Sequence, residues 1–195
     1  MVFVQPLGDL LGIIEEDALA SSFNKFSTKK DLDVSNFLKH LAIDYEKKDI
    51  ARTFLIFSDD FKGKVLAYFT IGLNVLHVNR RLEVQEAYEG VNLYENGYQP
   101  IYKLFMIGKD DNCPVALSIK HDVFEKEIVG LLKKVKKNVG TNLMYLDCVK
   151  DLHGYYKSLG FETFDYNRKS NLYYMVKAIW WNSWKNRENY NRIVI

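Results

Sequence analysis

The sequence predicts an α/β protein: a mixed, mostly antiparallel sheet with helices on both faces. Two patterns carry this prediction. The aromatic-rich segments 52–58 and 64–74 flank a short polar turn, which is typical of an antiparallel hairpin. Farther along, apolar segments at 100–108, 142–147 and 171–179 alternate with two helical segments. Strands that alternate with helices indicate a βαβ unit with a parallel pair of strands.

The first half of the chain supplies one clear helix. Residues 1–30 show no clear periodicity, and we expect a poorly defined lead-in there. Asp31 or Asp33 can cap a helix that starts near Asp33, and the charged run 46–49 is expected to be its solvated end. Apolar residues at steps of three and four form its buried face: Val34, Phe37, Leu38, Leu41, Ala42 and Tyr45. After the hairpin, residues 75–98 are expected to form a short helix and a loop.

The second half alternates more regularly. The strand at 100–108 is nearly all apolar, which is typical of a central strand buried on both faces. A loop is expected at 109–121, followed by a long helix from about Asp122 to Gly140. Its apolar stripe consists of Phe124, Ile128, Leu131, Leu132, Val135 and Val139. The next helix, DLHGYYKSL, presents two tyrosines on its apolar face and stops at Gly160.

Length and composition narrow the class of protein. The 195 residues favour a single domain, since domains usually run to about 100–200 residues. A hydrophobic content of 48% suffices for a sizeable core, and a net charge of +2 does not by itself indicate a nucleic-acid partner. Cys113 and Cys148 form neither a disulfide framework nor a metal motif, so we expect a cytoplasmic protein without a metal. No segment suggests a membrane span.

Two stretches carry a resemblance to a known family. Residues 142–164, NLMYLDCVKDLHGYYKSLGFETF, resemble the C-terminal half of the GNAT superfamily of N-acetyltransferases, in which a strand leads into a helix ending in a (F/L)YxxxGF signature. Residues 31–72 resemble the opening of the GNAT subgroup that includes toxins of toxin–antitoxin operons. The resemblance covers about residues 25–179. It implies one GNAT-like domain over residues 1–195, with a splayed parallel pair of strands and a tryptophan-rich tail at 180–195.

The resemblance implies an acetyl-CoA-dependent acetyltransferase and a place for each part of the reaction. Tyr156 matches the tyrosine that donates a proton to the departing thiolate, and a phenol within hydrogen-bond reach suits that role. Backbone amides of the splayed central strand would hold the carbonyl and the pantetheine arm of the cofactor, in the manner of an oxyanion hole. That contact is expected at Phe105, Met106, Ile107 and Gly108.

The phosphate-binding segment departs from the family pattern. GNAT members usually carry Q/RxxGxG/A before the long helix, whereas SIKHDVFEKEI at 118–128 holds no glycine. A helix N-terminus still binds anions through its dipole and its free amides, although the nearby Asp110, Asp111 and Asp122 oppose phosphate. The resemblance places the cofactor contact of this segment at Lys120, His121, Asp122, Val123 and Phe124.

The expected reaction is the direct attack of a primary amine, on a small molecule or a protein, on the acetyl thioester. The base is not singled out: Glu83, Glu86 and Glu89 all precede the central strand. A close relation to the toxins would imply the amino group of a charged tRNA as acceptor and a small antitoxin as partner. The alternative from another class is a GNAT-like protein that no longer catalyses and binds a partner instead, which the missing glycines motivate.

Simpler interpretations stand beside these. Tyr156 lies on an ordinary helical stripe, where aromatic residues mostly serve packing. The lysines at 126–137 are most often a solvated face rather than a surface for RNA or for the phosphates of CoA. Cys148 is best explained as a small buried hydrophobe. The tryptophans of the tail can pack on the domain, form a homodimer interface or stack on bases.

Overall fold

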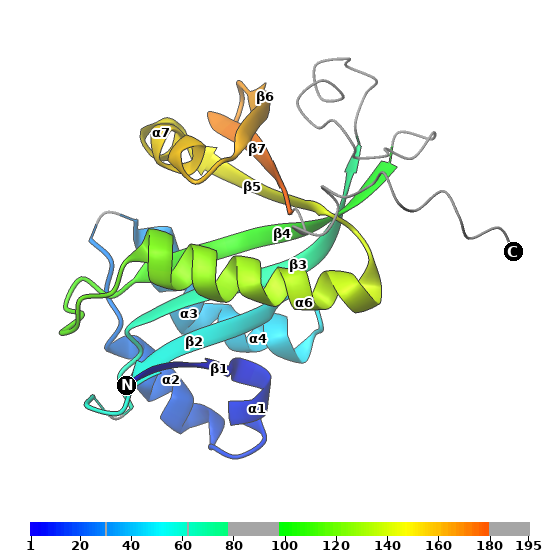
Figure 1. Cartoon of the computed structure of the whole chain (residues 1–195). Coiled ribbons are helices and arrows are strands. Elements are labelled where there is room, and N and C mark those ends of the chain that lie inside the picture. Colours follow the sequence, from blue (N-terminus) through cyan, green and yellow to red (C-terminus); the bar gives the residue numbers. More distant parts are fainter. Residues whose placement is uncertain (30, 62, 78–97, 180–195) are drawn as a thin grey trace, which may run out of the picture.

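The computed structural model describes residues 1–29, 31–61, 63–77 and 98–179. Within them, seven strands form one sheet in the order β1-β2-β3-β4-β5-β7-β6 (Figure 1). Neighbouring strands are antiparallel except for β4 and β5, which are parallel. This confirms the expected mixed, mostly antiparallel sheet. The strands are β1 (Val2–Pro6), β2 (Arg52–Ser58), β3 (Ala67–His77), β4 (Tyr98–Lys109), β5 (Leu143–Val149), β6 (Glu162–Asn167) and β7 (Leu172–Ala178).

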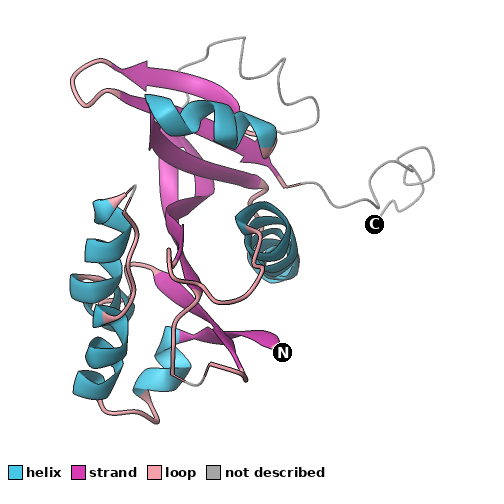
Figure 2. Cartoon of the chain, turned by 90° about the vertical axis from the view of Figure 1, so that its left-hand side faces the viewer, coloured by secondary structure: helices cyan, strands magenta, loops and turns pink. Residues whose placement is uncertain are grey.

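Helices cover both faces of the sheet (Figure 2). One face carries α1 (Leu7–Leu11), α2 (Glu16–Asn24), α3 (Leu32–His40) and α4 (Ala42–Lys47). The other face carries the π-helix η1 (Ile119–Ile128), α6 (Val129–Val139) and α7 (Lys150–Ser158), which share one hydrophobic core with the sheet. Among the described residues, no helix has the length and apolar character needed to cross a membrane.

The N-terminal segment is not the loose lead-in expected at residues 1–30. Strand β1 pairs with β2 along its length, and α1 and α2 pack against the sheet. Leu7, Phe23 and Phe26 are buried in that core, and burying such a side chain stabilises the fold by ~1.5–3 kcal/mol. The sequence pattern missed these elements because helices of five and nine residues are too short to show several turns of periodicity.

The helix expected from Asp33 is divided in two. Leu41 lies between α3 and α4 with φ −122° and ψ −26°, and its side chain is exposed rather than part of the apolar face. Asp31 caps α3, because its Oδ1 accepts a hydrogen bond from the backbone amide of Asp33 at 3.1 Å. Of the two capping residues that the sequence allowed, the structure selects Asp31.

Glu46 lies in the run that was expected to be solvated, yet its side chain is buried. Its Oε2 accepts a hydrogen bond of 2.9 Å from the backbone amide of Thr53, and Nη1 of Arg52 lies 3.4 Å from its Oε1. The carboxylate therefore joins α4 to β2. Burial is the largest influence on Glu46 and raises its pKa, while the Thr53 amide and Arg52 oppose that shift.

The middle of the chain is more strand-like than expected. β3 runs on to His77 and β4 begins at Tyr98, so both ends of the segment 75–98 are strand. The helix and loop expected between them would fall on residues 78–97, outside the described residues. β6 was not expected at all. It is an edge strand of mostly exposed residues, which gives it little apolar signal in the sequence.

The long helix starts at Ile119, earlier than expected, and its first part is π-helical. A π-helix bonds residue i to i+5 instead of i+4, so the buried stripe is displaced from an α-helical pattern. Val123 and Val129 are accordingly buried, whereas Val139 is 60% exposed although the sequence placed it in the stripe. Gly140 ends α6 with φ +77°, as expected.

Replacing Gly72 by alanine should destabilise the fold. A Cβ there would lie 2.8 Å from the carbonyl oxygen of Ile50 and 2.9 Å from the ring of Phe105. We expect the free energy of unfolding to fall by about 1–3 kcal/mol. Gly130→Ala is the control, because a Cβ at that helical position meets nothing within 4 Å and should stabilise by ~0.5–1 kcal/mol. Denaturant unfolding measures both, and an equal response of the two variants would contradict the packing.

Glu46 should make stability depend on pH. In the folded state the raised pKa keeps the carboxyl protonated at pH values where the unfolded chain, with the ordinary value of 4.5, has lost its proton. Its contribution is therefore complete below the unfolded pKa and declines as the pH rises through the folded pKa. In Glu46→Gln this decline should be absent. Unfolding free energies of wild type and variant that stay parallel from about pH 4 to about pH 7 would contradict the shift.

Candidate active site

The parallel strands β4 and β5 part soon after they meet. They pair only at Tyr102 with Met144 and at Lys103 with Tyr145, although β4 continues to Lys109. Beyond these pairs β5 stays with β7 and β4 stays with β3, and the two halves of the sheet diverge (Figure 1). Backbone groups on the facing edges of β4 and β5 therefore lack a strand partner there, and such groups are strong hydrogen-bonding sites.

A β-bulge lies on β4 where the strands part. In its pairing with β3, Thr70 faces Met106 and Ile71 faces Leu104, so Phe105 is the extra residue. The bulge changes which face each later side chain occupies. Leu104 packs in the core under η1 and α7, whereas Met106 packs with the helices of the opposite face.

The four residues expected to hold the cofactor carbonyl all lie at this bulge or just after it. Phe105 meets Tyr45 edge-on, with ring centroids 6.2 Å apart. Ile107 returns to the core under η1, and Gly108 passes close to α3, since a Cβ on it would lie 2.3 Å from Cγ1 of Val34. Their backbone therefore runs along the gap, while their side chains serve packing.

Tyr156 projects from α7 into the core beside the gap. Its ring contacts Phe161, with centroids 5.9 Å apart, and its side chain is 9% exposed. No residue in the described part of the chain offers its hydroxyl a hydrogen bond. Burial, followed by the influence of Cys148, raises the pKa of the phenol above its ordinary value of 10.0, so the group carries its proton at neutral pH.

The turn after α7 explains the glycine next to Phe161. Gly160 adopts φ +83°, which favours glycine, and the amide of Phe161 bonds the carbonyl of Tyr156 at 3.2 Å. This reversal inserts Phe161, which is 1% exposed, between α7 and η1, where it meets the ring of Phe124 at 5.6 Å. Phe161, the residue that follows the turn, therefore packs against the ring of Tyr156.

The start of η1 is a capped helix without glycine. The hydroxyl of Ser118 accepts from the amide of His121 at 3.2 Å, and Asp122 Oδ2 accepts from the amide of Ser118 at 2.7 Å. Within the described residues the amides of Ile119 and Lys120 have no hydrogen-bond acceptor. Free amides at a helix N-terminus are groups that attract anions, and the Asp122 carboxylate lies beside them.

Val123 and Phe124 cannot present their side chains to a cofactor, because both are fully buried in the core. The amide of Val123 already bonds the carbonyl of Ser118. Of the five residues expected to contact the cofactor in this segment, Lys120 and the exposed His121 lie nearest the free amides. Glu83, Glu86 and Glu89 lie outside the described residues.

Lys177 connects α7 to η1, and it was not singled out from the sequence. Its Nζ donates to the carbonyl of Leu159 at the end of α7, lies 3.7 Å from Glu125 Oε1 of η1, and sits 5.1 Å above the ring of Phe124. Burial lowers the pKa of Lys177, and Glu125 opposes that shift. A lone lysine within the apolar strand NLYYMVKAI was the available signal.

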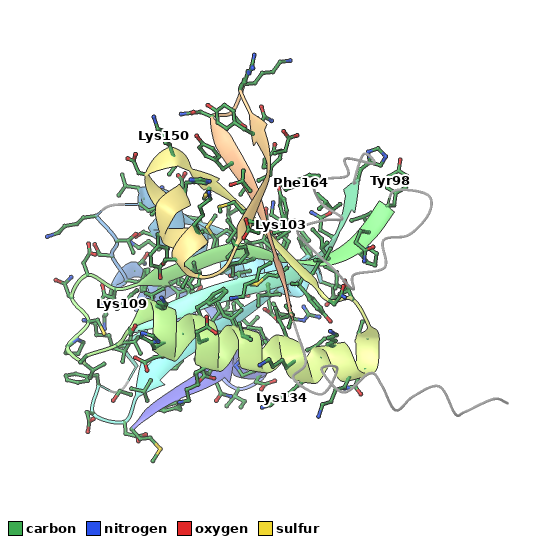
Figure 3. All side chains as sticks on the ribbon, turned by 45° about the horizontal axis from the view of Figure 1, so that its top comes forward. Tyr98, Lys103, Lys109, Lys134, Lys150 and Phe164 are labelled. Atoms are coloured by element: carbon green, nitrogen blue, oxygen red, sulfur yellow. The ribbon has the colours of Figure 1, made fainter. Side chains whose placement is uncertain are left out.

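Lys103 and Asp147 form an ion pair on the face of the sheet opposite Tyr156. Lys103 is the last residue of β4 that pairs with β5, and its Nζ lies 3.1 Å from Oδ1 of Asp147. The Lys103 side chain lies where β4 and β5 separate (Figure 3). Neither residue was singled out from sequence, because their meeting depends on strand register. The described residues hold no group of histidine, cysteine, aspartate and glutamate placed to bind a metal.

The lysines of η1 and α6 largely form the exposed face that the sequence predicted. Lys126, Lys133, Lys134 and Lys137 are exposed, and Lys134 projects from the outer side of α6 (Figure 3). Lys136 differs, since its Nζ donates to the carbonyl of Ile179 at 2.9 Å. Cys148 is buried with its sulfur 3.5 Å from that of Met175, which confirms its packing role.

No family model and no curated protein sequence matches the chain. Solved structures do match. A bacterial toxin superposes with a TM-score of 0.69 at 12% identity, over 92% of this chain and 91% of the toxin. AtaT complexed with acetyl-methionyl-tRNAfMet gives 0.65 at 15% identity, over 89% and 94%. A tyrosine-to-phenylalanine mutant of the AtaT toxin, bound to the C-terminus of the antitoxin AtaR and acetyl-CoA, gives 0.61 at 14%, over 89% and 92%.

The chain has the fold of these toxins. This is the GNAT-like arrangement that the sequence resemblance implied, with one parallel pair of strands in a mostly antiparallel sheet and helices on both faces. The match to the bacterial toxin covers 92% of this chain, a longer stretch than the residues of about 25–179 over which the sequence resemblance runs.

Removing the hydroxyl of Tyr156 should leave stability unchanged. Because the hydroxyl has no partner among the described residues, Tyr156→Phe should change the free energy of unfolding by less than about 0.5 kcal/mol. Tyr68→Phe is the contrast, since the buried Tyr68 hydroxyl donates to the carbonyl of Val34 at 2.5 Å and its loss should cost about 1–2 kcal/mol. Equal losses in the two variants, measured by denaturant unfolding, would show that Tyr156 is a structural hydrogen-bond donor.

Proposed function

We propose that the protein is an acetyl-CoA-dependent N-acetyltransferase that acts on a primary amine. The observation that carries the proposal is the gap between β4 and β5, with a bulge at Phe105 on one side and the unpartnered phenol of Tyr156 beside it. This combination supplies free backbone donors for a carbonyl and a proton for a leaving group within one GNAT fold. Either feature alone would have an ordinary structural explanation.

Acetyl-CoA supplies an activated acetyl group as a thioester. The amides of β4 after the bulge would stabilise the charge that develops on the carbonyl oxygen during attack. Tyr156 would donate its proton to the departing sulfur, and its raised pKa keeps that proton available at neutral pH. Phe161 and Phe124 hold the phenol in place and exclude water from its inner side.

The start of η1 fits the phosphates in part. Two free amides at Ile119 and Lys120, the helix dipole and the side chains of Lys120 and His121 favour an anion. Asp122 opposes it, because its negatively charged carboxylate is held beside these amides by a hydrogen bond from the amide of Ser118. We therefore expect weaker retention of the phosphates than a glycine-rich loop would give, with most cofactor contacts along β4.

The solved structures support one class of acceptor. The structure of AtaT complexed with acetyl-methionyl-tRNAfMet supports a charged tRNA as the acceptor class for this chain, and the exposed lysines of η1 and α6 suit a polyanion. The AtaR complex supports an antitoxin as a protein partner. Small-molecule and protein amines are the other acceptors to test.

A binding protein without catalysis is the second candidate. The specific observation in its favour is the Asp122 carboxylate at the helix N-terminus, where the family places phosphate. Such a protein would not bind acetyl-CoA, so the two candidates differ in a direct measurement.

Calorimetric titration with acetyl-CoA, with desulfo-CoA and adenosine 3′,5′-bisphosphate as controls, tests the proposal. We expect binding of the whole cofactor, and acetyl transfer to at least one of three acceptors: aminoacylated tRNA, spermidine and a peptide with a free N-terminus and a lysine. Tyr156→Phe should keep the affinity for acetyl-CoA and lose about 100-fold or more in turnover. Folded protein that binds no acetyl-CoA would support the binding protein, and a fully active Tyr156→Phe would remove that residue as the acid.

A further inference from the structure

Strand β5 presents different residues to the two faces of the gap. Leu146 and Cys148 point into the core that contains Tyr156, whereas Tyr145 packs in a separate cluster on the opposite face. Side chains alternate along a strand, so Asp147 shares the face of Tyr145. The proposed proton donor and Asp147 therefore lie on opposite faces of the sheet, at the same stretch of β5.

Asp147 is held at the edge of the gap by Lys103. The ammonium of Lys103 lies 3.1 Å from Oδ1 of Asp147 and is flanked by aromatic rings, at 5.1 Å from the centroid of Phe105 and 5.6 Å from that of Tyr145. These contacts fix the cation, which in turn fixes one carboxylate oxygen. The other oxygen, Oδ2, has no hydrogen-bond partner among the described residues, and the side chain is 32% exposed.

The Asp147 carboxylate is close enough to both faces to act on the groups around it. After burial, it is the leading charge that raises the pKa of Tyr145 and of Cys148. It also adds to the rise in the pKa of Tyr156, behind burial and other neighbours. The Asp147 carboxylate and the Tyr156 phenol thus influence each other from opposite faces of the sheet.

We propose that Asp147 receives the proton of the acceptor amine, on the face of the sheet opposite Tyr156, and that Lys103 is its positioning residue. The proposal rests on the proposed function. It assigns the acceptor to the face formed by Lys103, Phe105, Tyr145 and Asp147. A thioester held in the gap would then lie between a proton donor on one side and a proton acceptor on the other, an arrangement that suits direct attack.

Acetyl transfer moves two protons and exchanges one bond for another. As the bond from nitrogen to the acetyl carbon forms and the carbon–sulfur bond breaks, one amine proton passes to Oδ2 of Asp147. The proton of Tyr156 passes to sulfur. A neutral amine and a thioester thereby become an amide and a thiol. Transfer of the proton from Asp147 to the phenolate of Tyr156 through water restores both residues.

The competing explanation is an ordinary ion pair that joins β4 to β5. Such a partly exposed pair stabilises by ~0–1 kcal/mol and has no effect on turnover beyond stability. Catalysis and structure can therefore be separated by measuring turnover and affinity on folded protein.

The test compares Asp147→Asn with Asp165→Asn. Asp165 lies on β6 and pairs with Tyr174 of β7, the residue that Asp147 also pairs with, so it shares the neighbourhood but lies farther from β4. We expect Asp147→Asn to lower kcat about 100-fold or more, with the Kd for acetyl-CoA and the thermal unfolding nearly unchanged. Asp147→Glu should recover part of the loss, and Asp165→Asn should behave as wild type. The acceptors are aminoacylated tRNA, spermidine and the peptide named above.

Each outcome has a distinct meaning. Turnover of Asp147→Asn within about threefold of wild type would overturn the role of Asp147 and leave the proposed function intact. A loss of the same size in Asp165→Asn would also overturn it. Removing either negative charge would then lower turnover, and the effect would not be specific to Asp147. A wild-type chain that acetylates none of the three acceptors would overturn the proposed function and the role of Asp147 together.

Discussion

The early parting of β4 from β5 is the constraint on which the rest of the site depends. After two paired residues on each strand, the facing edges must find partners other than each other, because unpaired backbone groups in a protein interior are costly. The bulge at Phe105 interrupts the regular pairing of β4 and places Met106 on the face opposite Leu104. In the proposed reaction, the acetyl thioester would place its carbonyl oxygen between the two strands, as an acceptor for the free amides of these edges.

Different contacts position the residues on the two faces of the sheet at the gap. Lys177 connects the end of α7 to the side chains of η1, and Phe161 fills the space between those helices. Both contacts lie on the face of Tyr156, and Phe161 packs against its ring, while its hydroxyl has no partner among the described residues. The opposite face is fixed by the Lys103 and Asp147 pair. The edges of the gap are thus positioned by packing on one face and by an ion pair on the other.

Patterns that act locally could be predicted from the sequence, and contacts that depend on register could not. The hairpin of β2 and β3, the glycine ends at Gly140 and Gly160, and the position of Tyr156 on α7 all follow from local periodicity and turn chemistry. The π-helical start of η1 and the burial of Glu46 break those patterns, because tertiary packing decides them. Lys103 and Asp147 are far apart in sequence, and only the two paired residues of β4 and β5 bring them together.

Hydrogen exchange of the backbone amides of residues 104–108, with and without acetyl-CoA, tests the central claim most directly. We expect acetyl-CoA to slow exchange in this segment of β4, while the amides of β2, which lies away from the gap, stay unchanged. The comparison of acetyl-CoA with desulfo-CoA separates the contact to the carbonyl from contacts to the rest of the cofactor. Unchanged exchange at residues 104–108, in protein saturated with acetyl-CoA, would contradict the claim that the gap between β4 and β5 holds the reacting group.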